Sequence, residues 1–125
     1  MIPEHENCEL CVPDAVLCEN ELAYARYDSN SLAPGHVLVV PRRHVADFFD
    51  MTAAEQRAVV ELLVQARKLI GALHAPDGYN IGANIGNAAG QSRMHVHVLL
   101  IPRRIGDVPN PGGGIRCVLP GKRPA

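Results

Sequence analysis

Residues 95–101 read HVHVLLI, and Pro102 follows them directly. Polar and apolar side chains alternate at the start of this stretch, which predicts a β-strand over its length that stops before the proline. Because side chains of a strand point alternately to its two faces, His95, His97 and Leu99 share one face. We expect the opposite face to pack against a helix. The two imidazoles are a candidate site, although an isolated pair of this kind is also common on surfaces and in hydrogen-bonded cores.

One long helix is predicted downstream of the first strands. Thr52 and Glu55 have the spacing of a capping box, which marks the start of a helix. The apolar face of this helix, expected to end near Leu73, is formed by Val59, Leu62, Leu63, Ala66, Leu69, Ile70 and Leu73. Further strands are expected at 15–19, 22–27, 36–40 and 79–85. This order of elements, with strands first, then one helix and then further strands, predicts an α+β fold with an antiparallel sheet.

The chain has 125 residues, a mass of 13.5 kDa and a formal net charge of −1. These values predict a single domain over 1–125, with a polar arm at 1–14 and an extended proline- and glycine-rich tail at 106–125. The balanced charge argues against a nucleic-acid partner and against an anionic membrane surface. The first residues lack the charged and apolar segments of a signal peptide, and there is no long apolar run. We therefore expect a cytoplasmic protein without a membrane span.

Two cysteines, Cys8 and Cys11, form a CxxC motif in the arm. In a cytoplasmic chain this spacing favours a metal or redox role over a structural disulfide. Metal sites often combine two such thiolates with two distant imidazoles, and His44 and His95 are the candidates. The alternatives are two free thiols and a redox pair. The sequence argues against the redox pair because no βαβ pattern surrounds the motif.

The loop that precedes the two histidines is rich in small residues: residues 86–92 read GNAAGQS. Small side chains let backbone N–H groups converge, and the side chains of Gln91 and Ser92 add further donors. Such a concavity suits a phosphate, which would lie beside His97. The alternative is that the glycines only make a turn.

Several motifs together resemble the signature of the histidine triad (HIT) nucleotide hydrolases and transferases. They are NIG at 84–86, AGQS at 89–92, HVHVLLIPR at 95–103 and PGHVLVVP at 34–41. The resemblance covers nearly the whole chain. Two shorter motifs, GD at 106–107 and GGIR at 113–116, are similar to the branch that includes dinucleoside-polyphosphate hydrolase-like members. The family implies a HIT-like antiparallel sheet and a homodimer with two-fold symmetry, paired through the helix and a strand.

This resemblance also implies a covalent mechanism on a nucleotide or dinucleotide substrate. His97 corresponds to the family nucleophile, whose imidazole attacks the α-phosphorus and forms a nucleotidyl-histidine that water then hydrolyses. Ser92, with the backbone at Gly90 and Gln91, corresponds to the groups that stabilise the crowded phosphorus centre. Asn84 corresponds to a residue that helps to hold the phosphates.

Three more positions carry family roles or depart from them. Asp28 matches the residue that holds the nucleoside ribose, and His36 matches a position in the catalytic neighbourhood that orients its neighbours. Leu99 replaces the third histidine, which in the family contacts phosphate and assists protonation of the leaving group. Leucine can do neither. The alternative function is therefore a zinc-stabilised nucleotide-binding protein with weakened turnover.

Several members of the family carry the same N-terminal CxxC. The resemblance implies a structural zinc held by Cys8, Cys11, His44 and His95, whose four ligand atoms would close the coordination shell. Such a zinc would also fix His95 beside the nucleophile.

Overall fold

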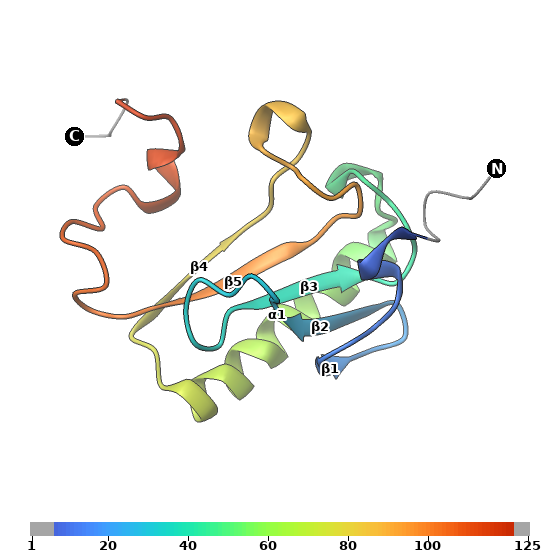
Figure 1. Cartoon of the computed structure of the whole chain (residues 1–125). Helices are drawn as coiled ribbons and strands as arrows, with labels where there is room; N and C mark the ends of the chain where they lie inside the picture. Colours follow the sequence, from blue (N-terminus) through green and yellow to red (C-terminus); the bar gives the residue numbers. More distant parts are fainter. Residues whose placement is uncertain (1–6, 122–125) are drawn as a thin grey trace.

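The computed structural model describes residues 7–121. A five-stranded antiparallel sheet has the strand order β1-β2-β3-β5-β4, and one long helix, α1 (Ala53–His74), lies across one of its faces (Figure 1). The strands are β1 (Val16–Glu19), β2 (Ala23–Tyr27), β3 (Val37–Pro41), β4 (Gly78–Gly82) and β5 (Val98–Arg103). Short 3-10 helices lie before, between and after them: η2 (Glu9–Cys11), η3 (Phe48–Asp50), η4 (Asn87–Ala89) and η5 (Gly114–Val118). The predicted α+β class and antiparallel sheet are confirmed.

Helix α1 begins at the predicted capping box. The Thr52 hydroxyl accepts from the Glu55 N–H at 3.0 Å, and the Glu55 carboxylate accepts from the Thr52 N–H at 2.9 Å. Arg43 donates to the same carboxylate at 2.8 Å and 3.0 Å, which lowers the pKa of Glu55. This buried carboxylate therefore ties the chain after β3 to the start of the helix.

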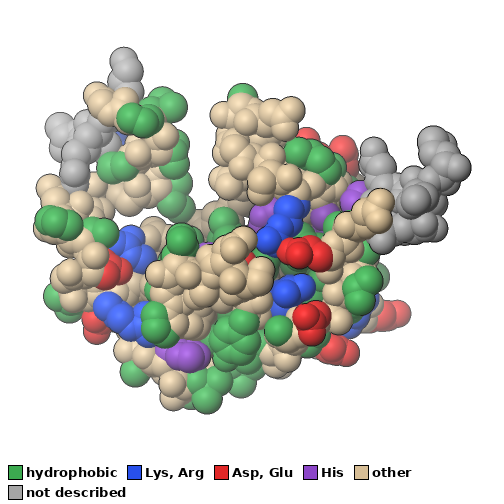
Figure 2. All heavy atoms as spheres, viewed as in Figure 1, with side chains coloured by type: hydrophobic (Ala, Val, Ile, Leu, Met, Phe, Trp, Pro, Cys, Tyr) green, Lys and Arg blue, Asp and Glu red, His purple; other side chains and the backbone are tan. Residues whose placement is uncertain are grey.

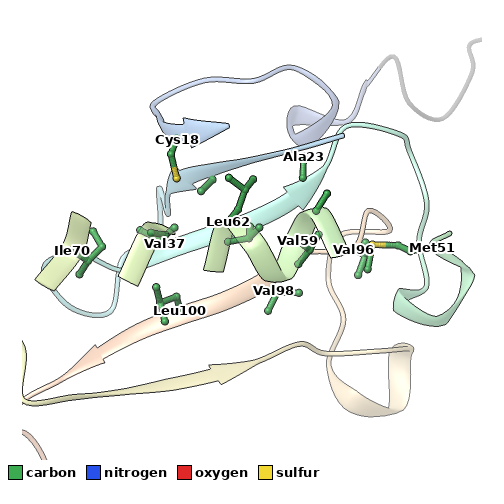
Figure 3. Packing of buried hydrophobic residues seen from close by; sticks show 14 of the residues in the cluster. Cys18, Ala23, Val37, Met51, Val59, Leu62, Ile70, Val96, Val98 and Leu100 are labelled. Carbon is green, nitrogen blue, oxygen red and sulfur yellow. The ribbon is translucent and has the colours of Figure 1, made fainter. Parts of the chain in front are cut away.

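The main core lies between α1 and the sheet (Figure 3). Val59 and Leu62 of the helix meet Val37, Val98 and Leu100 of the central strands, and all five are buried. The predicted helix face is correct except at Leu73, which is 63% exposed on the last turn. Packing of this face holds β3 and β5, and with them the segments that carry the histidines.

The opposite face of the sheet is covered at β2 and β3 by the N-terminal arm. Leu10 is fully buried there against Tyr24, Leu38 and Val40, with Leu99 packed at the side of the cluster. The Tyr24 hydroxyl donates a hydrogen bond to the Leu10 carbonyl. The CxxC motif on either side of Leu10 is thereby held against the sheet.

The strand predicted over 95–101 begins later and ends later than expected. Hydrogen-bonded pairing of β5 with β3 starts at Val98 and stops at Leu100, so the two histidines precede the strand. The Val96 N–H instead donates to Val45 at 2.7 Å. Pro102 lies inside β5 because only β4 adjoins the strand at that point, and a missing N–H on the free side breaks no ladder.

Other boundaries also differ from the predictions. Strand β4 ends at Gly82 rather than at residue 85, and β3 includes Pro41, where β2 is its one neighbour. The tail, expected to be extended, contains η5. Residues 1–6 of the predicted arm and 122–125 of the predicted tail lie outside the described residues. Within 7–121, no helix combines the length and the apolar character needed to cross a membrane.

Candidate functional site

His95 is fixed by the backbone of β3. Its ring is fully buried, and its Nε2 lies 2.7 Å from the carbonyl oxygen of Pro41. A carbonyl oxygen only accepts, so Nε2 carries the proton and donates it to Pro41. The lone pair of Nδ1 then faces the sulfur atoms of Cys8 and Cys11, each 3.4 Å away. Burial lowers the pKa of His95, which keeps the ring neutral and able to act as a ligand.

The structure brings together all four predicted metal ligands: Cys8, Cys11, His44 and His95, whose ligand atoms lie within 4.8 Å of one another. Nδ1 of His44 lies 3.2 Å from the Cys11 sulfur. In a tetrahedral site with metal–nitrogen bonds of about 2.0 Å and metal–sulfur bonds of about 2.3 Å, neighbouring ligand atoms are about 3.5 Å apart. The three nitrogen–sulfur separations of 3.2–3.4 Å are close to this value, so the cluster can hold a metal ion.

The Cys11 thiol is held in its protonated form by its surroundings. Burial and the neighbouring Cys8 raise the pKa of Cys11 to about 11. A metal ion that enters the cluster must therefore displace a proton from Cys11, and its affinity will rise with pH.

His97 is oriented by the backbone of the residue two positions before it. Its Nδ1 lies 2.9 Å from the carbonyl oxygen of His95. Because that oxygen only accepts, Nδ1 carries the proton and Nε2 keeps a lone pair. A neutral imidazole with an available nitrogen is the form that can attack an electrophile. One residue, His95, thus contributes its ring to the metal cluster and its carbonyl to the orientation of His97.

The loop at 86–92 is braced from within by the buried side chain of Gln91. Its Oε1 accepts from the Gly86 N–H at 2.9 Å, and its Nε2 donates to the carbonyls of Ala46 at 2.7 Å and Arg93 at 3.0 Å. Both amide hydrogens and the amide oxygen are used. The predicted side-chain donor to phosphate is therefore engaged in holding the loop.

Backbone groups of the same loop also form hydrogen bonds with one another. The Gly90 N–H donates to Asn87 at 3.0 Å, and the Gln91 N–H donates to Gly86 at 3.1 Å. Gly90 has φ +87°, a conformation that favours glycine. Ser92 follows with an exposed side chain, so its hydroxyl is accessible at the mouth of the loop.

Asn84 and Leu99 line one pocket of about 410 Å³ on the sheet face opposite α1. Asn84 is exposed, and Leu99 lies two residues beyond His97 on the same side of the chain. Where the HIT pattern has a third histidine, this face therefore presents an aliphatic side chain two residues beyond His97.

Asp28 and His36 form a second group, at the two ends of the loop that joins β2 to β3. His36 is 1% exposed, and its Nδ1 accepts from the Leu32 N–H at 3.1 Å. The proton is then on Nε2, which faces the Asp28 carboxylate at 3.5 Å. Burial lowers the pKa of His36, partly offset by Asp28. His36 is thus a buried neutral ring behind Asp28 and the 28–32 loop.

Comparison with known proteins identifies the family. The HIT domain pattern matches residues 9–106. The chain belongs to the HIT family. It is 36% identical over 93 residues to the AP-4-A phosphorylase of Mycobacterium tuberculosis, covering 74% of this chain and 48% of that protein. It is 33% identical over 96 residues to the bis(5'-nucleosyl)-tetraphosphatase [asymmetrical] of Schizosaccharomyces pombe, and this match covers 77% of this chain and 53% of that protein. This HIT chain thus spans about half the length of both relatives.

A solved structure supports the same assignment. A Zn-bound histidine triad family protein from Mycobacterium smegmatis superposes with a TM-score of 0.73 at 29% sequence identity. The superposition covers 82% of this chain and 78% of that one. The HIT-like fold predicted from the sequence is confirmed.

Some residues that build the site were not predicted. The carbonyl of Pro41 orients the His95 ring, and Tyr24 anchors the arm that carries the CxxC motif. The η5 residues Ile115 and Val118 wall the pocket beside Leu99. No sequence pattern identifies which backbone carbonyl will accept a hydrogen bond from a histidine. The apolar residues in the glycine- and proline-rich tail, however, do indicate that the tail packs against another part of the fold.

Proposed function

We propose that the protein is a nucleotide hydrolase or nucleotidyl transferase that acts on dinucleoside polyphosphates or similar nucleoside phosphates. The observation that carries this proposal is the contact between His97 Nδ1 and the His95 carbonyl, which leaves the His97 Nε2 lone pair available five residues after the end of the 86–92 loop. Family membership supports it, since relatives are named as an AP-4-A phosphorylase and a bis(5'-nucleosyl)-tetraphosphatase.

The proposed reaction has two displacement steps. The Nε2 lone pair of His97 attacks the α-phosphorus, and the P–O bond to the departing phosphate breaks with its electron pair on the bridging oxygen. The nucleotidyl-histidine is then attacked by water, which loses a proton to solvent as the P–N bond breaks and the electron pair returns to Nε2. One difficult displacement thus becomes two easier ones.

The loop residues have separate parts in this proposal. The exposed Ser92 hydroxyl donates to a phosphate oxygen, and the Asn84 amide holds the phosphates. Gly90 and Gln91 act by fixing the loop, since their N–H groups and the Gln91 amide bond within it.

Asp28 is proposed to accept from the ribose hydroxyls of the bound nucleoside. His36 is a positioning residue here: its Nδ1 holds the Leu32 N–H and its Nε2 faces Asp28, so it sets the shape of the 28–32 loop. With an exposure of 1% it does not itself meet substrate.

We propose that the metal of the cysteine–histidine cluster is zinc. Two thiolates and two imidazoles are the donor set that zinc prefers in closed structural sites, where the ion supplies rigidity rather than reactivity. Cys8 and Cys11 anchor the arm, His44 follows β3, and His95 precedes β5. We propose the cytoplasm as its compartment, where reducing conditions keep the thiols available as ligands.

Intact-protein mass spectrometry during turnover of diadenosine polyphosphate tests the nucleophile. The parent should gain the mass of one adenylyl group and release nucleotide, whereas His97→Ala should do neither and still bind mononucleotide. His74→Ala is the matched control, because it removes a histidine at the end of α1 and should react like the parent. Hydrolysis by His97→Ala at the parent rate would contradict the assignment.

A second candidate function follows from Leu99, which can neither donate a hydrogen bond nor carry a proton. This second candidate is a protein that binds nucleotides but no longer hydrolyses them. General acid–base assistance is worth about 10²–10⁴-fold in rate, so Leu99→His should gain activity if protonation at this position limits the reaction. Tight nucleotide binding by the parent with no adduct and no product would favour this second function.

We also propose a homodimer that forms through α1 and the edge strand β4. Exposed apolar side chains cluster there: Phe49 at 73%, Val60 at 56%, Val64 at 54% and Ile81 at 50%. A pocket of about 300 Å³ lined almost wholly by apolar side chains lies between the helix and β4. An unpaired strand edge beside an apolar face suits a self-complementary two-fold interface.

Light scattering coupled to gel filtration tests this dimer. The parent should have the mass of two chains, and Ile81→Glu should shift it toward one. Val12→Glu makes the same change at a site that is 66% exposed on the arm and should leave the mass unchanged. A monomeric parent would refute the interface.

A further inference from the structure

The C-terminal tail turns the sheet face beside Leu99 into a pocket. Helix η5 lies across from the 86–92 loop, and a notch separates the two in the space-filling view (Figure 1, Figure 2). The pocket of about 410 Å³ in this region is in the range of small-molecule sites. Its apolar walls include Leu99, Ile101, Ile115, Val118 and Leu119.

The tail is anchored at the point where it leaves β5. Asp107 accepts two hydrogen bonds from Arg103, at 2.7 Å and 2.8 Å, and one from the Arg104 N–H at 3.0 Å. These contacts hold the pKa of Asp107 well below its usual range. The tail therefore leaves β5 in a defined direction and presents η5 to the sheet.

Polar groups are few in the pocket, and none of its lining side chains is charged. Asn80 accepts from Arg103 through Oδ1 at 2.7 Å, which leaves its Nδ2 as a donor on the tail side, near Gly114. Asn84 adds a second amide. Apolar walls with amide groups at the edge suit a flat, uncharged heterocycle, whose faces pack on aliphatic side chains and whose edge accepts hydrogen bonds.

The pocket is linked to His97 through Leu99, which lies two residues further along the chain. Leu99 follows His97 on the same face, and Asn84 leads into the loop that carries Ser92. A substrate whose phosphorus lies at His97 therefore extends its remaining half over Leu99.

We propose that this pocket binds the base of the departing nucleotide, so that the enzyme selects substrates with a nucleoside at both ends of the phosphate chain. The proposal rests on the function proposed above and specifies its substrate class. A departing nucleotide leaves as a phosphate anion and needs no proton from position 99. Leu99 instead provides aliphatic surface for the departing base.

Binding measurements test the pocket without depending on turnover. Calorimetry compares two probes, a methylene-bridged, non-hydrolysable diadenosine tetraphosphate and the same polyphosphate chain with one adenosine. The second base would bury apolar surface against the aliphatic walls, so the parent should bind the two-base probe about 10-fold more tightly. Ile115→Glu should abolish this advantage while leaving the affinity for the one-base probe unchanged.

Two controls keep the result interpretable. Ile105→Glu makes the same change at a tail residue that is 90% exposed and outside the pocket, and it should keep the advantage. Val118→Glu changes a second wall residue, 73% exposed, and should reproduce Ile115→Glu. Equal affinities of the parent for both probes, or an advantage that survives both wall variants, would overturn the proposal. Failure of the His97 adduct experiment, with the two-base advantage intact, would refute the catalytic function alone.

Discussion

The bracing role of Gln91 makes a quantitative prediction about the protein without substrate. Gln91→Ala removes three hydrogen bonds of 2.7–3.0 Å, to Gly86, Ala46 and Arg93. Each bond contributes about 0.5–1.5 kcal/mol. Gly86 and Ala46 are exposed, so water can replace the lost partner and each loss falls near the lower end. With about 0.8 kcal/mol for the lost buried methylene, the free energy of unfolding should fall by about 3 kcal/mol.

Urea unfolding followed by circular dichroism measures this change directly. Asn87→Ala is the matched control, since it truncates an exposed side chain of the same loop and should change the free energy by less than about 0.5 kcal/mol. If Gln91 were instead a direct phosphate donor, its substitution would weaken nucleotide binding and leave the stability of the free protein unchanged. A loss below about 1 kcal/mol would therefore refute the bracing role.

Three further predictions concern the metal cluster and two buried ionisable groups. Elemental analysis should find one zinc per chain in the parent and none in Cys11→Ser, whose melting temperature should be lower because metal binding contributes to folding. Glu55→Gln should lower the free energy of unfolding by about 1 kcal/mol at pH 7. Because Arg43 lowers the pKa of folded Glu55, this deficit should disappear as the pH falls below about 4, which urea titrations at pH 7 and pH 3.5 will measure. Burial lowers the pKa of His36, so on acidification this imidazole is protonated in the unfolded chain before it is protonated in the folded protein. The free energy of unfolding should therefore fall as the pH drops below about 6.5. The melting temperatures of His36→Asn at pH 7.5 and 5.5 should differ less than those of the parent.

The alternation of side chains between the two faces was predictable, but the limits of the strand were not. Val96 and Val98 are buried toward the helix, as the pattern predicts, although only Val98 belongs to β5. Where the ladder starts depends on how far β3 reaches, since Val39 is the last residue that pairs with it. Strand boundaries are therefore set by a partner that lies some sixty residues earlier, which local sequence does not encode.

The candidate site was likewise predictable from the sequence only in part. The CxxC motif suggested a metal site with His44 and His95 as candidates, and the HIT resemblance was needed to favour these four members over free thiols. The partners of Gln91 were not predictable, because an amide can serve a ligand or its own loop equally well, and two of its three partners are backbone carbonyls brought close by folding. The packing of η5 depended on apolar tail residues whose target, β4, is known only from the fold.

The cluster of Cys8, Cys11, His44 and His95 also imposes an order on synthesis. Cys11 is added to the chain 84 residues before His95, an interval of about 4–17 s at 5–20 residues per second. Throughout that interval the nascent chain carries a half-built chelate of two thiols and, later, one imidazole. The fourth member of the cluster, His95, comes from the segment that also carries His97, so the cluster is complete only after that segment has been translated. The cluster and His97 therefore become available in the same late step of synthesis.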